Sequence, residues 1–155
     1  MSIWRTISAV IGIAVVLIYA GGANYWNRDY GWYESLNRPA WQPPGFVFGI
    51  IWPYNFIVIG IALWVIASKA PPVLVAISLS IFAVSVVFAL RWSYLFYSVH
   101  DLRGAAAALV TTAVLTIPLL VITFTQSWKA GVALLPYQVW IFLAAALSSS
   151  YATMN

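Results

Sequence analysis

Five long stretches of this sequence carry almost no charged residues, and they constrain the fold more than any other feature. They cover residues 4–26, 46–68, 73–97, 104–126 and 132–151. A helix needs about 20 mostly apolar residues to cross the hydrocarbon core of a bilayer, and each stretch has that length. The sequence therefore predicts an all-α membrane protein, a bundle of five transmembrane helices that forms a single domain over residues 1–155.

The composition supports this prediction. Of the 155 residues, 64% are hydrophobic and 6% are charged, whereas soluble globular proteins have about 45–50% and 25%. The segments between the apolar stretches are too short to form a separate soluble domain. We therefore expect an integral, multi-pass membrane protein that is surrounded by membrane lipid.

Side chains for polar chemistry are scarce. The sequence has no cysteine, one histidine (His100) and three acids (Asp29, Glu34 and Asp101). A metal site with several ligands, or a proton relay within the membrane, lacks the residues to build it. We therefore expect no metal and no required cofactor, and hydrolytic catalysis is disfavoured. His100 lies beside Asp101 in a short turn and is interpreted as a solvated loop residue rather than a haem ligand.

The net charge of +4 is spread over single, scattered residues. It forms no basic cluster of the kind that binds nucleic acid, so we expect no nucleic-acid partner. The positive residues divide almost evenly between the two membrane faces. The positive-inside rule therefore gives no orientation.

The longest connection, residues 27–45, is polar and rich in proline and contains Arg28 and Arg38. With five spans, this loop emerges on the same face of the membrane as the C-terminus. We expect it to act as a lid over that face of the bundle.

Three of the nine tryptophans, Trp52, Trp92 and Trp140, lie inside the predicted spans. From the helical rise, Trp52 and Trp92 lie about 9 and 8 Å below the face that carries the long loop, and Trp140 about 12 Å from the other face. These depths are compatible with a pocket that has Trp140 as its floor, Trp52 and Trp92 as its walls and the loop as its cover. The alternative is that the three rings only pack helix against helix.

Three polar side chains near these tryptophans favour a ligand-binding pocket. Asn55 lies one turn after Trp52, and an amide in hydrocarbon needs a partner, either another helix or a ligand. Tyr137 and Ser148 lie on the same predicted helix as Trp140. A few hydrogen-bonding groups on an apolar wall are typical of a site for a large, flat, apolar ligand.

Three sequence motifs lie in the predicted lid, at the end of the third span and within the fifth span. The first is WYESLNRPAWQPPG at residues 32–45, followed by Val47, Phe48 and Trp52. The other two are WSYLFY at residues 92–97 and LPYQVW at residues 135–140. In order and spacing they resemble the translocator protein family, also called tryptophan-rich sensory proteins (TspO/MBR), whose first motif reads WY..L.KP.W.PP..VF...W. Arg38 stands at the lysine position of that motif.

The resemblance implies a five-helix bundle in a bacterial membrane that binds porphyrins and other bulky hydrophobic small molecules, usually as a homodimer. Carried onto this sequence, it implies that the ligand contacts Tyr33 and Trp41 in the lid. In the helices, it implies contacts with Trp52, Trp92 and Trp140. The porphyrin is then a ligand rather than a cofactor, and the protein acts as a receptor or sensor.

Two other functions stay open. Bacterial relatives are linked to light- and oxygen-dependent breakdown of porphyrin, and in that case Trp52 and Trp140 would be the catalytic residues. Such chemistry would come from the ligand, because the sequence offers no acid–base group for it. The third function is transport of a tetrapyrrole or lipid, which the lack of a visible internal repeat disfavours.

The sequence departs from the family at two polar positions. Ala89, three residues before Trp92, and Ser148, eight residues after Trp140, stand where the family has asparagine. Because two polar anchors are lost or weakened, we expect a different ligand preference.

Overall fold

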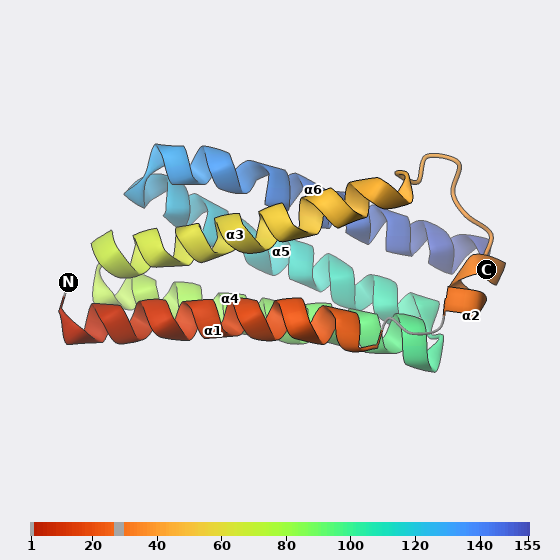
Figure 1. The fold of residues 1–155 in the computed structure, drawn as a ribbon, viewed down its shortest axis with the longest axis horizontal. Helices are drawn as coiled ribbons and strands as arrows, with labels where there is room; N and C mark the ends of the chain where they lie inside the picture. Colours follow the sequence, from red (N-terminus) through yellow and green to blue (C-terminus); the bar gives the residue numbers. More distant parts are fainter. Residues whose placement is uncertain (1, 27–29) are drawn as a thin grey trace.

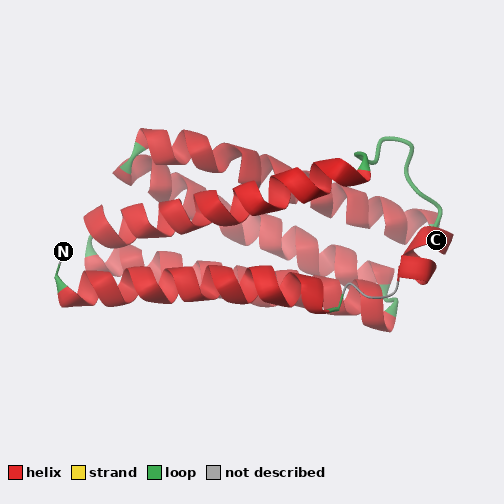
Figure 2. Ribbon diagram, viewed as in Figure 1, coloured by secondary structure: helices red, strands yellow, loops and turns green. Residues whose placement is uncertain are grey.

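The computed structural model describes residues 2–26 and 30–155, and the regular structure within them is helical (Figure 2). In chain order the helices are α1 (Ile3–Tyr25), α2 (Tyr30–Ser35), α3 (Gly45–Lys69), α4 (Pro72–Tyr94), the π-helix η1 (Leu95–Val99), α5 (Leu102–Gln126) and α6 (Trp128–Met154). Arg28, which the sequence analysis places in the lid, lies outside the described residues.

Five of these helices, α1, α3, α4 with η1, α5 and α6, are long and apolar enough to cross a membrane. The prediction of an all-α, multi-pass membrane protein with five spans is therefore confirmed. The last span differs by several residues at both ends, because α6 covers Trp128–Met154 rather than residues 132–151. Ser127 alone separates α5 from α6, and its side chain accepts a hydrogen bond from the Ala130 N–H at 3.4 Å. This side-chain cap allows α6 to begin at the residue directly after Ser127.

The five long helices form a closed ring in the order α1, α3, α6, α5, α4. Each packs against the next, and α4 returns to α1. The two termini lie at opposite ends of the bundle (Figure 1). We call the end that carries the C-terminus, α2 and the start of α3 the lid end, and the other the N-terminal end. Helices α3 and α5 run from the lid end to the N-terminal end, antiparallel to the other three.

The bundle is tightly packed toward the N-terminal end. A Cβ atom built on Gly12 of α1 would lie 3.1 Å from the Cβ of Leu63 on α3. One built on Gly131 of α6 would lie 2.4 Å from the ring of Phe124 on α5. Glycine therefore allows both helix pairs to approach closely. Arg5 closes this end by donating a hydrogen bond to the Ala67 carbonyl near the end of α3 at 2.9 Å.

Three helices continue through a proline, α3 at Pro53, α5 at Pro118 and α6 at Pro136, and the last two have side-chain donors close by. The sequence analysis expects Pro118 to kink its helix unless neighbouring groups compensate for the lost hydrogen bond. Pro118 removes the donor of the Val114 carbonyl, and on the neighbouring Ala113 carbonyl the hydroxyl of Thr116 and the amide of Gln138 both donate, at 3.0 and 2.9 Å. Pro136 removes the donor of the Val132 carbonyl, and the Tyr54 hydroxyl donates to the neighbouring Ala133 carbonyl at 2.7 Å.

The long connection contains one helix that the sequence analysis does not predict. Helix α2 packs on the lid end, where the Trp32 ring stacks on the ring of His100 with centroids 3.8 Å apart and planes at 7°. Trp32 also contacts Phe96 edge to face, with centroids 5.4 Å apart. His100 is exposed, as expected for a loop residue, and has a left-handed backbone conformation with φ of 63°. Its ring nevertheless packs against the lid.

Candidate functional site

A cavity of about 670 Å³ lies inside the ring at the lid end. Its volume falls in the range of about 300–1,000 Å³ that is common for small-molecule sites. Every long helix contributes to its wall, and the segment before α3 contributes to its cover. The residues that line it are Tyr19, Ala23, Tyr33, Arg38, Gln42, Gly45, Phe48, Gly49, Trp52, Pro53, Phe56, Ala89, Trp92, Phe96, Tyr97, Leu109, Trp140, Ala144, Leu147, Ser148 and Tyr151.

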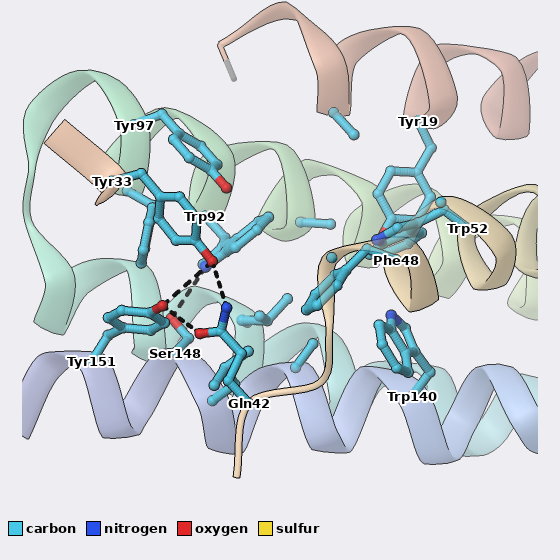
Figure 3. Close-up of a pocket in the computed structure, with 18 of the residues that line it drawn as sticks. Tyr19, Tyr33, Gln42, Phe48, Trp52, Trp92, Tyr97, Trp140, Ser148 and Tyr151 are labelled. Atoms are coloured by element: carbon cyan, nitrogen blue, oxygen red, sulfur yellow. Dashed lines mark hydrogen bonds between the residues drawn. The ribbon is translucent and has the colours of Figure 1, made fainter. Parts of the chain in front are cut away.

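The deep part of the cavity is walled by aromatic rings. Trp52 and Phe56 lie one turn apart on α3 and stack with centroids 5.6 Å apart. Tyr19 of α1 meets both of them edge to face, at 6.0 and 5.4 Å. Phe48, one turn before Trp52 on α3, contacts Trp140 of α6 edge to face at 5.1 Å (Figure 3). This wall is built from apolar ring faces and edges, which suit a flat apolar ligand.

Trp92 lines the cavity nearer the lid end, and its position depends on α6. Its indole N–H donates a hydrogen bond to the Ser148 hydroxyl at 3.1 Å. Figure 3 shows Trp92 between the lid cluster and the deep rings, so Trp52 lies deeper than Trp92. The sequence analysis places these two tryptophans at similar depths. The difference arises because the chain between α2 and α3 runs over the cavity before α3 begins.

The lid end of the cavity holds a hydrogen-bonded cluster of three polar side chains (Figure 3). Gln42 donates to the Tyr33 hydroxyl at 3.0 Å, and the Tyr151 hydroxyl donates to the side-chain carbonyl of Gln42. The hydroxyls of Tyr151 and Tyr33 lie 3.3 Å apart. Arg38 packs its guanidinium over the Tyr33 ring, 5.3 Å from its centroid. The cavity is thus polar at the lid and aromatic below it.

A second set of hydrogen bonds attaches the lid to the end of α6. The Asn37 backbone N–H donates to the Asn155 side-chain oxygen at 2.8 Å, and the Asn155 side-chain amide donates back to the Asn37 carbonyl at 3.2 Å. The Asn37 side chain also donates to the Met154 carbonyl at 3.4 Å. We call this set of contacts the latch. It joins residues that are 118 positions apart in the sequence.

The structure brings five of the predicted ligand-binding residues together around the cavity. These are Tyr33, Trp52, Trp92, Trp140 and Ser148. The photo-oxidative role of Trp52 and Trp140 stays a prediction, as does transport. The two indoles do line the same cavity.

Three predicted residues, Trp41, Asn55 and Tyr137, do not line the cavity. Trp41 is in the lid segment and is 50% exposed. Asn55 and Tyr137 are fully buried behind the wall, and Tyr137 lies against Tyr19. Neither amide atom of Asn55 has a hydrogen-bond partner in the part of the chain that the structure describes.

Several residues of the wall are not predicted from the sequence. Tyr19, Phe48 and Phe56 complete the aromatic surface, and Gln42 and Tyr151 form the polar cluster with Tyr33. One signal was available for Tyr151, because it follows Trp140 and Ser148 at helical spacing on the same face. For Tyr19 no sequence signal distinguishes a cavity residue from an ordinary core residue.

The described residues that line the cavity include one cation and no acid. Arg38 is the charged residue among those that line the cavity. Within residues 2–26 and 30–155, no group of three potential metal ligands is present. The arrangement can therefore bind a ligand through ring contacts, hydrogen bonds at the lid and one cation.

Fold and site together define the class of protein: a small multi-pass membrane protein of five helices with an aromatic cavity at one end of the bundle. The sequence profile of the TspO/MBR family matches residues 9–153. The chain therefore belongs to the TspO/MBR family.

Three relatives are similar over nearly their whole length. Protein CrtK of Rhodobacter capsulatus is 28% identical over 97% of this chain and 93% of its own. The uncharacterized membrane protein YtaB of Bacillus subtilis is 29% identical over 95% of this chain and 94% of its own. The tryptophan-rich protein TspO of Chlorobaculum tepidum is 28% identical over 97% of this chain and 96% of its own. All three relatives are bacterial.

Proposed function

We propose that this protein is a membrane receptor that binds a porphyrin or a similar flat, bulky, apolar ligand in the cavity at the lid end. The observation that carries the proposal is the meeting of Trp52, Trp92 and Trp140, from three different helices, around one cavity. Ring stacking and apolar burial would supply the affinity.

The distribution of polar groups supports one orientation of such a ligand. Its ring system would lie among the deep aromatic residues. Its carboxylates would lie at the lid, where Arg38 carries a positive charge and Gln42 and Tyr33 offer hydrogen-bond donors. A guanidinium paired with a carboxylate forms one of the stronger protein–ligand hydrogen bonds.

The first test is a fluorescence titration with protoporphyrin of the purified protein in lipid nanodiscs. The wild type should show saturable quenching of its tryptophans. Replacement of Trp52 and Trp140 by phenylalanine keeps a smaller ring at each position. If the two changes together lose the equivalent of one aromatic contact, about 0.5–1.5 kcal/mol, Kd should rise by about two- to twelvefold. Binding that does not saturate in the wild type would contradict the proposal.

The matched control for this test replaces two tryptophans that face outward. Trp64 and Trp128 are 48% and 66% exposed and do not line the cavity. Their double replacement by phenylalanine should leave Kd unchanged. If this variant loses as much affinity as the variant at Trp52 and Trp140, the porphyrin binds on the outer surface of the bundle.

The second test addresses the polar end. Arg38→Gln should weaken binding of protoporphyrin, which has free carboxylates, by about threefold or more, because a charge-assisted hydrogen bond is lost. It should not weaken binding of the neutral dimethyl ester of protoporphyrin. Equal losses for both ligands would mean that Arg38 does not meet the carboxylates.

A further inference from the structure

The wall of the cavity reaches the outer surface of the bundle at one stripe of α3. Among the residues that line the cavity, four are exposed: Arg38 at the lid and Gly45, Gly49 and Pro53 on α3. The three α3 residues are spaced by four, so they lie on one side of the helix. We call them the α3 stripe. It borders both the cavity and the region where lipid surrounds the bundle.

The α3 stripe lies on the side of the helix that faces α1. The opposite side of α3 is occupied by α6, because the Tyr54 hydroxyl donates a hydrogen bond to the Ala133 carbonyl. Trp52 and Phe56, next to the stripe, contact Tyr19 of α1. The stripe is therefore one edge of the gap between α1 and α3.

Helix α1 leaves α3 on the lid side of Tyr19 and packs against α4 instead. A Cβ atom on Gly22 would lie 2.7 Å from the Leu90 side chain, and the Ser93 hydroxyl donates to the Ala23 carbonyl at 3.3 Å. Trp26 contacts Tyr94 edge to face at 6.0 Å. Figure 1 shows α1 and α3 moving apart toward the lid end. On this side the α3 residues that line the cavity, Gly45, Gly49 and Pro53, are exposed.

The α3 stripe itself offers almost no side-chain bulk. A Cβ atom built on Gly45 or Gly49 would meet no other atom within 4 Å. Pro53 has no N–H, so the carbonyl of Gly49 lacks its helical donor. Such a carbonyl is tolerated at membrane depth where it lines a cavity rather than where lipid packs directly against it.

The route through the lid, where Arg38 is exposed, is by contrast crossed by hydrogen bonds between described residues. The cluster of Tyr33, Gln42 and Tyr151 spans it, and the latch between Asn37 and Asn155 holds it from outside. An apolar molecule dissolved in the bilayer would have to cross water and break these contacts to enter there. Through the gap beside the α3 stripe it would displace only acyl chains.

We propose that the gap between α1 and α3 is a lateral entrance through which apolar ligands pass between the bilayer and the cavity, with the α3 stripe as its edge. This inference rests on the proposed function for the identity of the ligand, but not for the existence of the entrance. In the absence of a ligand, the entrance would admit lipid acyl chains.

The first experiment narrows the entrance with Gly49→Leu. The matched control is Gly60→Leu, on the same helix, where a Cβ atom also meets nothing within 4 Å but the residue does not line the cavity. Protoporphyrin is supplied from protein-free vesicles to the protein in nanodiscs, and tryptophan quenching is followed by stopped flow. Gly49→Leu should slow both uptake and release by about fivefold or more, and Gly60→Leu should match the wild type. Unchanged rates in Gly49→Leu would overturn the entrance.

The second experiment fixes the lid. Because the sequence has no cysteine, Asn37→Cys and Asn155→Cys together give a pair that a short bismaleimide can join. Uptake from vesicles should keep its rate within about twofold after cross-linking, since the ligand does not use the lid route. If cross-linking stops uptake, the ligand enters through the lid and the lateral entrance is wrong.

The third experiment needs no porphyrin. Nanodiscs made with brominated acyl chains quench tryptophans that the chains can reach, and the contribution of Trp52 is the difference between proteins with and without Trp52→Phe. Gly49→Leu should reduce the quenching of Trp52, and Gly60→Leu should not. If the wild type binds no porphyrin but this difference is seen, the proposed ligand is wrong and the entrance stands. If the quenching of Trp52 is the same in both variants, the entrance is wrong whatever the ligand.

Discussion

Trp92 is oriented by one hydrogen bond to a residue 56 positions away in the sequence. Its indole N–H donates to the Ser148 hydroxyl, which is buried in the wall of the cavity. Without this acceptor the indole would hold an unsatisfied donor inside the bundle, which carries a free-energy cost. Ser148 thus supplies an acceptor at a position where the family pattern has asparagine.

We predict that Ser148→Ala weakens porphyrin binding by about two- to tenfold, because a hydrogen bond contributes about 0.5–1.5 kcal/mol and fixes the ring that the ligand meets. The measurement is the same fluorescence titration, together with near-ultraviolet circular dichroism, which reports the loss of a fixed indole orientation. The control is Ser149→Ala, whose hydroxyl bonds within α6 to the Ala145 carbonyl at 2.8 Å. Wild-type affinity in both variants would show that the bond does not prepare Trp92 for the ligand.

At the scale of elements, the lid is held to the bundle from both ends. Helix α2 is attached through the stack of Trp32 on His100, and the latch attaches the segment that follows α2 to the end of α6. A short helix of six residues does not form stably alone in water, so these contacts are what keeps α2 in place.

We predict that Asn155→Ala loosens the lid without unfolding the bundle. The Asn37 N–H loses its acceptor, so its exchange with solvent deuterium should speed up by about two- to tenfold. Hydrogen exchange measured by mass spectrometry on the lid peptide tests this. Thr153→Ala is the control, since its hydroxyl bonds to the Ser150 carbonyl on its own helix at 2.9 Å. If exchange in the lid is unchanged by Asn155→Ala, the latch does not hold it closed.

On the scale of the whole molecule, the bundle has one solid end and one hollow end. Close helix contacts at Gly12 and Gly131 fill the N-terminal end, whereas the lid end contains the cavity. A membrane protein gains no hydrophobic driving force from bringing apolar helices together in lipid, so close packing at the solid end has to hold the ring together. The hollow end is then not needed to hold the helices together and can contain a binding cavity.

We predict that added volume lowers the stability of the bundle at Gly131, in the solid end, and not at Gly60. Gly131→Ala places a Cβ atom 2.4 Å from the Phe124 ring and should lower the free energy of unfolding by about 1–3 kcal/mol. Gly60→Ala meets open space and should leave it unchanged or raise it, since alanine favours helix more than glycine. Unfolding in mixed detergent–SDS micelles measures both. Equal stability of the two variants would contradict this division of the bundle.

The sequence alone determined the helices. A run of about 20 apolar residues has few alternatives in a bilayer, because each backbone group must find its hydrogen bond within the segment. The five spans, the termini at opposite ends and the loop on the side of the C-terminus follow from this local requirement. Helix α2 cannot be predicted in this way, because a short helix depends on partners such as His100 rather than on its own sequence.

The cavity was predicted only in part, and the reason is geometric. The helical rise gives a depth along one helix, but which rings meet depends on where each helix starts and on its rotation in the ring. Trp52 therefore lies deeper than predicted from its distance along the helix from the start of the span. Asn55 lies behind the wall of the cavity rather than in it. Trp41 remained on the outside of the lid.

Only the tertiary structure decided where the cavity opens. The α3 stripe is a set of two glycines and a proline at helical spacing, and nothing in the sequence separates it from the other glycines of the spans. It borders an opening because α1 packs on α4 at the lid end and on α3 at the other. The sequence determines which segments cross the membrane, since that depends on each segment alone. Their mutual packing determines the cavity and its entrance, since these depend on contacts between residues far apart in the chain.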